Sequence, residues 1–303
     1  MDAAMNILVS GSSGLLGRKV LPRLREAGHQ VFRLVRRKPT TPDERRWNPE
    51  ERVDPIVLDR IDSVIHLAGD NISEGRWNEE KKRQIRDSRV RGTQRLAEAI
   101  AVATTPPRSL ICASAIGYYG DRGETLLDES STPGTGFLPD VCREWEQAAD
   151  AARAKGVRVA HVRLGVVLSA EGGALAKMLL PFKMGVGGVI GDGKQYWSCI
   201  GIDDAAGIFQ FAAENDRISG PLNAVCPEPV TNYEFTKTLG RVLGRPTLFP
   251  LPKVMARLAL GQMADELILA STRVAPKALQ DAGYSYTAPT VEAALRQSLE
   301  AHP

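Results

Sequence analysis

Three glycines at intervals of three residues, set between an apolar strand and a helix, constrain the fold more than any other feature of this chain. The strand covers Asn6 to Val9, and Gly11, Gly14 and Gly17 follow it. The first glycine lets the chain turn sharply, the second leaves room for a phosphate to approach, and the third lets the new helix pack closely. This order predicts the first half of a dinucleotide-binding βαβ unit.

A basic run ends the second predicted strand, Val31 to Val35. Chains that bind NAD usually carry Asp or Glu there, which accepts a hydrogen bond from the ribose 2′-hydroxyl. The residues here are Arg36, Arg37 and Lys38. A carboxylate would repel a 2′-phosphate, whereas a guanidinium binds it through two charge-assisted hydrogen bonds. The pattern therefore predicts NADP rather than NAD, with Arg36 and Arg37 at the 2′-phosphate.

Strands and helices alternate along the chain to about residue 170. The predicted strands are 62–69, 109–114 and 157–168, and the predicted helices are 78–100 and 141–155. This alternation predicts an α/β fold with a Rossmann-type, doubly wound parallel sheet. We expect an NADP-binding domain over residues 1–170, with the return of parts of 195–230 to it left open. A smaller, mainly helical substrate-side domain is expected over residues 171–303.

Composition argues against several classes of partner. The 303 residues carry 39 basic and 36 acidic side chains, a net charge of +3, so neither nucleic acid nor a membrane is expected as a partner. The four cysteines show no C-x-x-C or zinc-type spacing, which predicts reduced thiols, no metal site and a cytoplasmic chain. We expect no signal peptide, and no apolar run is long enough to span a bilayer. A homodimer stays open.

Several motifs resemble those of the extended short-chain dehydrogenase/reductase superfamily. They are the three glycines, Leu67-Ala68-Gly69, Ser114-x-x-Gly117-Tyr118-Tyr119-Gly120 and Trp197-x-x-Ile200-x-Ile202-Asp203-Asp204. The segments 76–78, 85–89, 180–182 and 220–232 are similar to its atypical NAD(P)-dependent epimerase-like branch, which is often labelled nucleoside-diphosphate-sugar epimerase or cell-division-inhibitor-related. The helical tail from Pro250 to Leu299 is similar to the C-terminal domain of that branch.

The resemblance implies a set of binding residues. Those implied at the pyrophosphate are Gly11, Ser13, Gly14, Leu15 and Leu16. Those implied near the adenosine are Leu67 and Ala68, with Gly69 beside them. Ser88 and Arg89 would reach in from the long helix, and Arg163, Gly165 and Val166 would lie by the nicotinamide. In an enzyme of this kind Gln195 and Trp197 would line the substrate pocket, although Trp197 fits a core position equally well.

The chain departs from the superfamily at the catalytic dyad. Redox members generally combine Ser with Tyr-x-x-x-Lys, in which the lysine lowers the tyrosine pKa from about 10 so that the phenol can exchange a proton. Ser114 and Glu146 fit that pattern, but Leu138 and Cys142 stand where the tyrosine and lysine would be. We expect no other register to recover the dyad.

Three interpretations stay open. Tyr118 or Tyr119 supplies the proton beside Ser114; another group, such as Lys183 or Cys142, supplies it; or the chain binds NADP without turning over a substrate. The sequence thus predicts an NADP-binding oxidoreductase or epimerase-like protein that acts on a small carbonyl or sugar-like substrate. The alternative is a non-catalytic redox sensor or scaffold.

Overall fold

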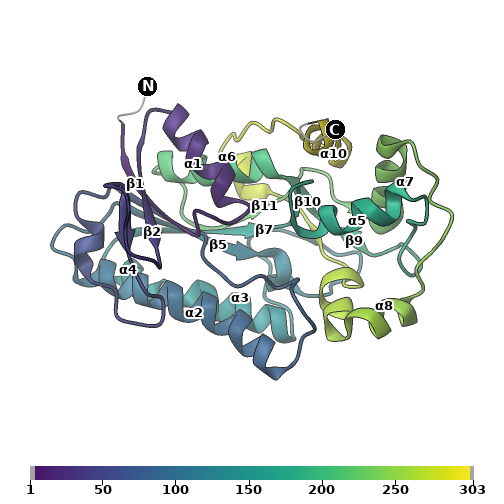
Figure 1. Cartoon of the computed structure of the whole chain (residues 1–303), viewed down its shortest axis with the longest axis horizontal. Helices are drawn as coiled ribbons and strands as arrows, with labels where there is room; N and C mark the ends of the chain where they lie inside the picture. Colours follow the sequence, from purple (N-terminus) through teal and green to yellow (C-terminus); the bar gives the residue numbers. More distant parts are fainter. Residues whose placement is uncertain (1–3, 301–303) are drawn as a thin grey trace.

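A seven-stranded parallel sheet lies at the centre of the computed structural model, which describes residues 4–300 (Figure 1). The strand order is β11-β7-β5-β4-β1-β2-β3. The strands are β1 (Asn6–Ser10), β2 (Gln30–Val35), β3 (Glu44–Arg46), β4 (Ser63–His66), β5 (Ser109–Ala115), β7 (Arg158–Leu164) and β11 (Gly220–Ala224). Strand order reverses between β1 and β4, and ligands of such sheets bind beyond the carboxyl ends of the strands at this switch point.

Helices cover both faces of the sheet (Figure 1). One face carries α1 (Gly17–Glu26) and α6 (Ile202–Glu214), and the other carries α2 (Glu79–Val102), α3 (Phe137–Gln147) and α4 (Asp150–Ala154). Alternate residues of β1 enter the two cores: Ile7 and Val9 join the core under α1 and α6, while Leu8 joins the core under α2. The predicted doubly wound α/β fold is confirmed.

Local signals explain where the elements begin and end. The α2 helix begins after Asn78, whose Oδ1 accepts a hydrogen bond from the Lys81 amide at 2.8 Å. The helix predicted over 141–155 is instead two helices, because α3 begins earlier, at Phe137, and ends ten residues later, before α4. The strand predicted over 157–168 is interrupted at Gly165, where a Cβ would lie 2.4 Å from the Ser198 carbonyl oxygen.

The later part of the chain forms a second core, which is mainly helical. Its helices are α5 (Gly173–Lys183), α7 (Asn232–Leu243), α8 (Lys253–Leu260) and α10 (Val291–Glu300), whereas α9 (Lys277–Asp281) packs Leu279 into the core under α1 and α6. Short strands pair as β8 (Val166–Leu168) with β10 (Cys199–Gly201), β9 (Tyr196–Trp197) with β12 (Val230–Thr231), and β6 (Leu126–Leu127) with β13 (Arg273–Val274). The domain division at residue 170 stays a prediction. Among residues 4–300 no helix has the length and apolar character needed to cross a bilayer.

Candidate functional site

The glycine loop, residues 11–17, joins β1 to the first residue of α1 and leaves no space for side chains at two of its glycine positions. Gly11 has φ +66°, and a Cβ there would lie 2.7 Å from the Leu67 carbonyl carbon. A Cβ on Gly17 would lie 2.3 Å from the Gly11 carbonyl oxygen. The third glycine therefore lets α1 approach the loop backbone itself.

The middle of the glycine loop offers unpaired hydrogen-bond donors. Within residues 4–300, the backbone N–H groups of Ser13, Leu15 and Leu16 donate no hydrogen bond. Ser13 and Gly14 are exposed, and the one atom within 4 Å of a Cβ built on Gly14 is the Gly11 carbonyl oxygen, at 3.2 Å. Unpaired amides at the start of a helix favour an anion such as a phosphate. The loop therefore fits the diphosphate of a dinucleotide.

A buried serine ties the two strands together at the switch point. Ser10 Oγ lies 2.7 Å from His66 Nδ1 and accepts hydrogen bonds from the Leu67 and Ala68 amides at 3.1 and 3.3 Å. Burial lowers the pKa of His66 to about 4, so the ring is neutral near pH 7. His66 is therefore a structural residue, because it orients the Ser10 hydroxyl that fixes Leu67 and Ala68 beside the glycine loop.

The two arginines after β2 differ in their partners. Arg37 forms a bidentate pair with the buried Glu44 carboxylate, with Nη1 to Oε2 at 2.8 Å and Nη2 to Oε1 at 2.5 Å. The hydrogen bond from Arg37 holds the pKa of Glu44 down at about 2. The exposed side chain of Arg36 has neither a hydrogen bond nor an ion pair within residues 4–300. Arg36 is therefore the free guanidinium here, whereas Arg37 also neutralises a buried carboxylate.

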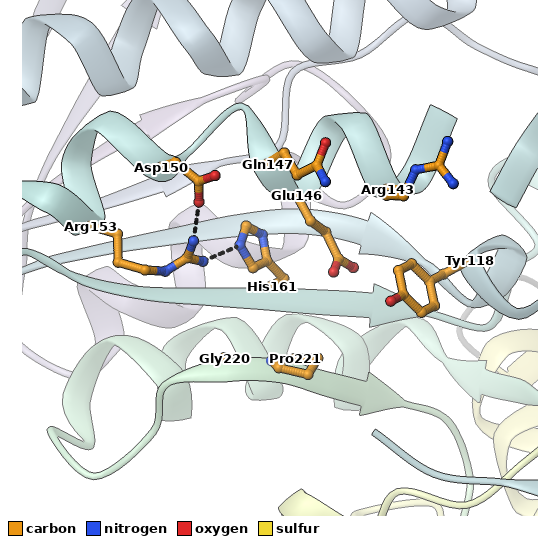
Figure 2. A pocket seen from close by; sticks show the side chains of 9 residues that line it. All are labelled: Tyr118, Arg143, Glu146, Gln147, Asp150, Arg153, His161, Gly220 and Pro221. Atoms are coloured by element: carbon orange, nitrogen blue, oxygen red, sulfur yellow. Dashed lines mark hydrogen bonds and ion pairs between the residues drawn. The ribbon is translucent and has the colours of Figure 1, made fainter. Parts of the chain in front are cut away.

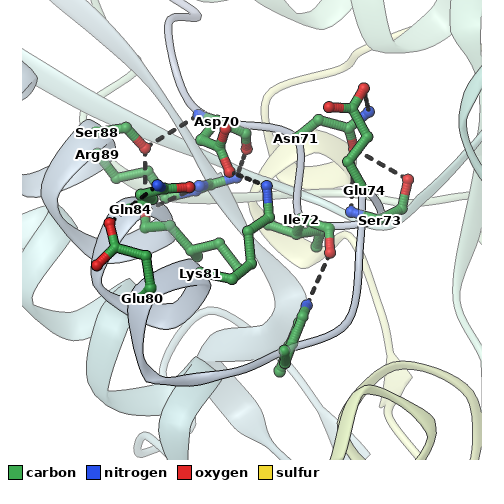
Figure 3. Close-up of polar contacts among 12 residues, drawn as sticks. Asp70, Asn71, Ile72, Ser73, Glu74, Glu80, Lys81, Gln84, Ser88 and Arg89 are labelled. Atoms are coloured by element: carbon green, nitrogen blue, oxygen red, sulfur yellow. Dashed lines mark hydrogen bonds and ion pairs between the residues drawn. The ribbon is translucent and has the colours of Figure 1, made fainter. Parts of the chain in front are cut away.

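Ser88 and Arg89 hold the loop that follows β4 (Figure 3). Ser88 Oγ accepts a hydrogen bond from the Asp70 amide at 3.0 Å, and Arg89 Nη2 donates to the Asp70 carbonyl at 2.9 Å. Lys81 Nζ reaches the Asp70 carboxylate at 2.5 Å. A Cβ on Gly69 would lie 3.5 Å from the Arg89 side chain. The two predicted binding residues thus position Gly69 and Asp70, next to the switch point.

A buried ion pair organises the region around Ser114. Arg163, near the end of β7, binds the Glu146 carboxylate of α3 through Nε and Nη2, each at 2.8 Å. Ser114 Oγ donates to Glu146 Oε1 at 2.8 Å. Burial by itself lowers the pKa of Arg163, and Glu146 more than offsets this, so the pKa lies above its usual value. The Ser114 hydroxyl therefore donates its hydrogen bond to the same Glu146 carboxylate that the Arg163 guanidinium binds.

The two adjacent tyrosines have different surroundings. Tyr119 is fully buried; its hydroxyl donates to Asn223 Oδ1 at 2.7 Å and accepts from Arg163 Nη1 at 2.9 Å. Burial raises the pKa of Tyr119 to about 12, which makes it a poor proton donor. Tyr118 is half-buried, and its ring centre lies 3.6 Å from the Arg163 guanidinium carbon. Of the two, Tyr118 alone retains access to solvent.

Tyr118 and Glu146 line a pocket of about 210 Å³ beside the sheet edge (Figure 2). The other lining residues are Arg143, Gln147, Asp150, Arg153, His161, Gly220 and Pro221. The Tyr118 hydroxyl points toward the β7 and β11 side of the pocket in Figure 2. Burial lowers the pKa of His161 to about 4, so its ring is neutral and lies 3.2 Å from an Arg153 nitrogen. The pocket therefore meets the Ser114–Glu146–Arg163 network through Glu146.

The remaining candidate proton donors are poorly placed for catalysis. Burial raises the pKa of Cys142 to about 12, so its thiol is inert at neutral pH. Lys183 is exposed at the end of α5 and has no hydrogen bond or ion pair to the described part of the network.

One Tyr-x-x-x-Lys spacing does occur, which corrects the expectation that no other register recovers the dyad. It joins Tyr233 and Lys237 in α7. Lys237 Nζ donates to Thr247 and lies 5.4 Å from the Tyr233 ring centre. Neither residue contacts the Ser114–Glu146–Arg163 network among the hydrogen bonds of residues 4–300.

The predicted residues beyond β7 lie in packed backbone or core. Gly165 separates β7 from β8, and Val166 pairs with Cys199 in β10. Trp197 belongs to the second core, where its indole N–H donates to the Ile268 carbonyl at 3.1 Å. Gln195 is also buried, and its amide donates to the Ile190 carbonyl at 3.1 Å. Trp197 therefore occupies a core position, and a substrate role for either side chain stays a prediction.

The family of the chain follows from its match to family models. The model of the NAD dependent epimerase/dehydratase family matches residues 7–224, which include the glycine loop and the Ser114–Glu146–Arg163 network. The chain belongs to the NAD dependent epimerase/dehydratase family. A domain of unknown function, DUF1731, matches residues 251–298. The predicted membership in the epimerase-like branch, with its C-terminal domain, is confirmed.

Relatives in this family extend over nearly the whole chain. An epimerase family protein of Mycobacterium bovis is 43% identical over 290 residues, covering 95% of this chain and 96% of its own. The human epimerase family protein SDR39U1, whose crystal structure is with NADPH, has a TM-score of 0.89 at 35% identity and covers 98% and 99% of the two chains. A nucleoside-diphosphate sugar epimerase from Corynebacterium glutamicum has a TM-score of 0.82 at 38% identity, and the match covers 98% of this chain and 58% of that one.

Several residues of the site were not expected from the sequence. The side chain of Asn223, from β11, accepts the hydrogen bond of the Tyr119 hydroxyl, and the backbone N–H of Asn223 donates to Glu129 Oε1 at 2.9 Å. Glu44 pairs with Arg37, and Ser10 fixes the switch point. The signal that could have found Ser10 is its place directly before Gly11, whereas Asn223 lies 104 residues from Tyr119 and gave none.

Proposed function

We propose that this chain binds NADP(H) at the switch point between β1 and β4. The observation that carries the proposal is the glycine loop, in which the amides of Ser13, Leu15 and Leu16 are among those that lack a partner within residues 4–300. Arg36 supplies a free guanidinium after β2, at the position that meets a 2′-phosphate in this type of fold. The NADPH in the structure of human SDR39U1 supports the same cofactor.

Thermal denaturation with added nucleotides tests the proposal. A ligand that binds the folded state raises the apparent stability, so NADPH should raise the Tm more than NADH at equal concentration. Arg36→Ala should reduce this difference, because the 2′-phosphate loses its guanidinium. Arg108→Ala is the matched control, since Arg108 is exposed and lies just before β5, at the amino ends of the strands, whereas the glycine loop lies at their carboxyl ends. Equal stabilisation of the wild type by NADH and NADPH would overturn the choice of NADP.

We further propose that the chain is an oxidoreductase or epimerase-like enzyme for a small carbonyl or sugar-like compound. A bound NADPH would supply the hydride, and the protein would supply position and electrostatics. The Ser114 hydroxyl donates a hydrogen bond to Glu146, so its remaining role is to accept a hydrogen bond from a bound molecule. Tyr118 is the candidate proton donor, since it is half-buried and lines the solvent-facing pocket.

A non-catalytic NADP(H) sensor is the second candidate, and the state of the network favours it. The hydroxyl groups of Ser114 and Tyr119 both donate hydrogen bonds to acceptors inside the protein, and no lysine of residues 4–300 takes part in the network. Oxidation of NADPH across a panel of aldehydes, ketones and keto-sugars separates the two candidates. Turnover that Tyr118→Phe abolishes would support the enzyme. Tight NADPH binding with no turnover across the panel would support the sensor.

A further inference from the structure

Exposed apolar side chains gather on one part of the molecule. Of thirteen large apolar side chains that are exposed in residues 4–300, ten lie between residues 180 and 258, with exposed fractions from 40% to 73%. One of the ten is Tyr233, and the others are Leu180, Met184, Val186, Leu248, Phe249, Leu251, Val254, Met255 and Leu258. We call these other nine the apolar patch. Exposed apolar side chains that gather on one part of a molecule mark an interaction site more often than ordinary surface composition does.

The two stretches of chain that carry the apolar patch lie side by side. The chain leaves α5 at Lys183 and runs beside the segment that leads into α8 (Figure 1). The Gly191 amide donates to the Leu251 carbonyl at 2.9 Å, and the Leu251 amide donates to the Val189 carbonyl at 2.8 Å. A Cβ on Gly188 would lie 1.9 Å from the Phe249 carbonyl oxygen, so the two backbones touch.

The α8 helix presents part of the apolar patch as an amphipathic surface. Val254, Met255 and Leu258 share one exposed side at spacings of one, three and four residues. Lys253 and Arg257 lie in the same helix. A helix with exposed aliphatic residues and adjoining cations is typical of proteins that lie on a membrane interface.

The two stretches that carry the apolar patch are strongly basic. Residues 177–194 and 241–260 contain seven cations and one carboxylate, in a chain whose total charge is nearly balanced. The cations are Lys177, Lys183, Lys194, Arg241, Arg245, Lys253 and Arg257, and the carboxylate is Asp192. The composition of the whole chain, with its net charge of +3, argued against a membrane partner because it does not reveal this local excess of positive charge.

Part of this charge is free to act on a ligand. Lys253 pairs with Asp192 and Arg257 pairs with Asp265, so these two cations are neutralised locally. The side chains of Lys183 and Arg245 have no hydrogen bond or ion pair among the described residues. A Cβ on Gly185 would lie 3.9 Å from Pro246, which brings the segments that carry these two cations together.

We propose that the apolar patch docks on an anionic lipid surface. Leu248, Phe249 and the apolar side of α8 would enter the interface, and Lys183 and Arg245 would meet lipid phosphates. A second copy of this chain is a poor occupant, because two patches with the same excess of positive charge would repel each other.

Vesicle flotation of the full chain tests the proposal. We expect binding to vesicles with about 30 mol% anionic phosphatidylglycerol, weak binding to pure phosphatidylcholine, and loss of most binding at about 0.5 M salt. The paired change Leu248→Asp and Phe249→Asp should lower the partition coefficient by about tenfold or more, because it replaces inserted apolar groups with charge. The paired change Lys183→Gln and Arg245→Gln should also lower it by about tenfold or more, and only for anionic vesicles.

Ile56→Asp is the matched control, since Ile56 is 69% exposed and lies outside the apolar patch. Its binding to vesicles should equal that of the wild type. Unchanged thermal denaturation shows that each variant folds. The proposal is overturned if the wild type ignores anionic vesicles, if it binds both vesicle types equally, or if the patch variants bind like the control. It is also overturned if sedimentation shows a dimer that Leu248→Asp and Phe249→Asp separate, or if the patch binds an acidic peptide but no vesicles.

Discussion

Arg163 grips the Glu146 carboxylate with two hydrogen bonds of 2.8 Å, and both side chains are almost inaccessible to solvent, at 3% and 14% exposed. The pair brings together α3 and β7, and it orients the Ser114 hydroxyl, which donates to the same carboxylate. Such a pair is costly to break, because removing one partner leaves the other charge buried alone.

Glu146→Gln is therefore expected to lower the free energy of unfolding by about 3–5 kcal/mol, measured by urea denaturation. The control lies in the same helix: Glu144 pairs with Arg86, whose side chain is 53% exposed. Glu144→Gln should cost no more than about 1 kcal/mol, since exposed pairs contribute little. Equal losses for the two variants would show that the Arg163 pair is not a buried organising contact.

The two tyrosines should separate structure from chemistry. Tyr119→Phe removes a buried hydroxyl that links Arg163 to Asn223, so we expect a loss of about 1–3 kcal/mol in the free energy of unfolding. Tyr118→Phe keeps the ring beside Arg163 and should change that free energy by no more than about 0.5 kcal/mol. A large loss of stability with Tyr118→Phe and none with Tyr119→Phe would reverse the two assignments.

Phenolate absorbance gives a second measurement on the same pair. Burial raises the pKa of Tyr119 to about 12, so this residue should remain protonated through neutral and moderately alkaline pH. The difference between the titration curves of the wild type and Tyr119→Phe should therefore appear near pH 12. A difference below pH 10, the ordinary pKa of the group, would contradict a buried phenol.

The sequence could predict the sheet and the glycine loop because their signals are local. An apolar run such as Asn6 to Val9 has few alternatives to a buried strand, and Gly11 stands where the chain needs φ +66°. The start of α2 was similarly visible, because Asn78 caps it. These features depend on neighbours within a few residues.

The network around Ser114 could not be predicted, because it depends on contacts between distant residues. Glu146 and Arg163 are separated by 17 residues, and Tyr119 meets Asn223 across 104. The sequence could not distinguish Tyr118 from Tyr119 either, since adjacent residues in a short 3₁₀ turn can face solvent or core. The pairing of Arg37 with Glu44 likewise depends on the docking of β3 against β2.

The pairing of Arg37 with Glu44 predicts that part of the folding stability is lost in acid. Arg37 lowers the pKa of Glu44 from its ordinary value of 4.5 to about 2. Because the folded-state pKa lies below that of the unfolded chain, the stabilisation from Glu44 is complete above about pH 4.5 and is lost as the pH falls toward 2. Other groups also titrate here, so the measured quantity is the difference between the wild type and Glu44→Gln in unfolding free energy at each pH. That difference should shrink on acidification, and a constant difference from pH 6 to 3 would contradict the ion pair.

Two glycines of the loop should respond differently to the same change. A Cβ on Gly17 would lie 2.3 Å from the Gly11 carbonyl oxygen, so Gly17→Ala must displace the loop or α1 and should lower the Tm. A Cβ on Gly14 meets the same oxygen at 3.2 Å, which requires only a small adjustment. Gly14→Ala should therefore keep a Tm near that of the wild type and still weaken NADPH binding about tenfold or more, because the methyl group would occupy the surface that the diphosphate approaches.

Thermal denaturation without nucleotide and titration of NADPH fluorescence measure the two effects separately. If Gly14→Ala bound NADPH as tightly as the wild type, the diphosphate would have to lie elsewhere than over the unpaired amides of the loop.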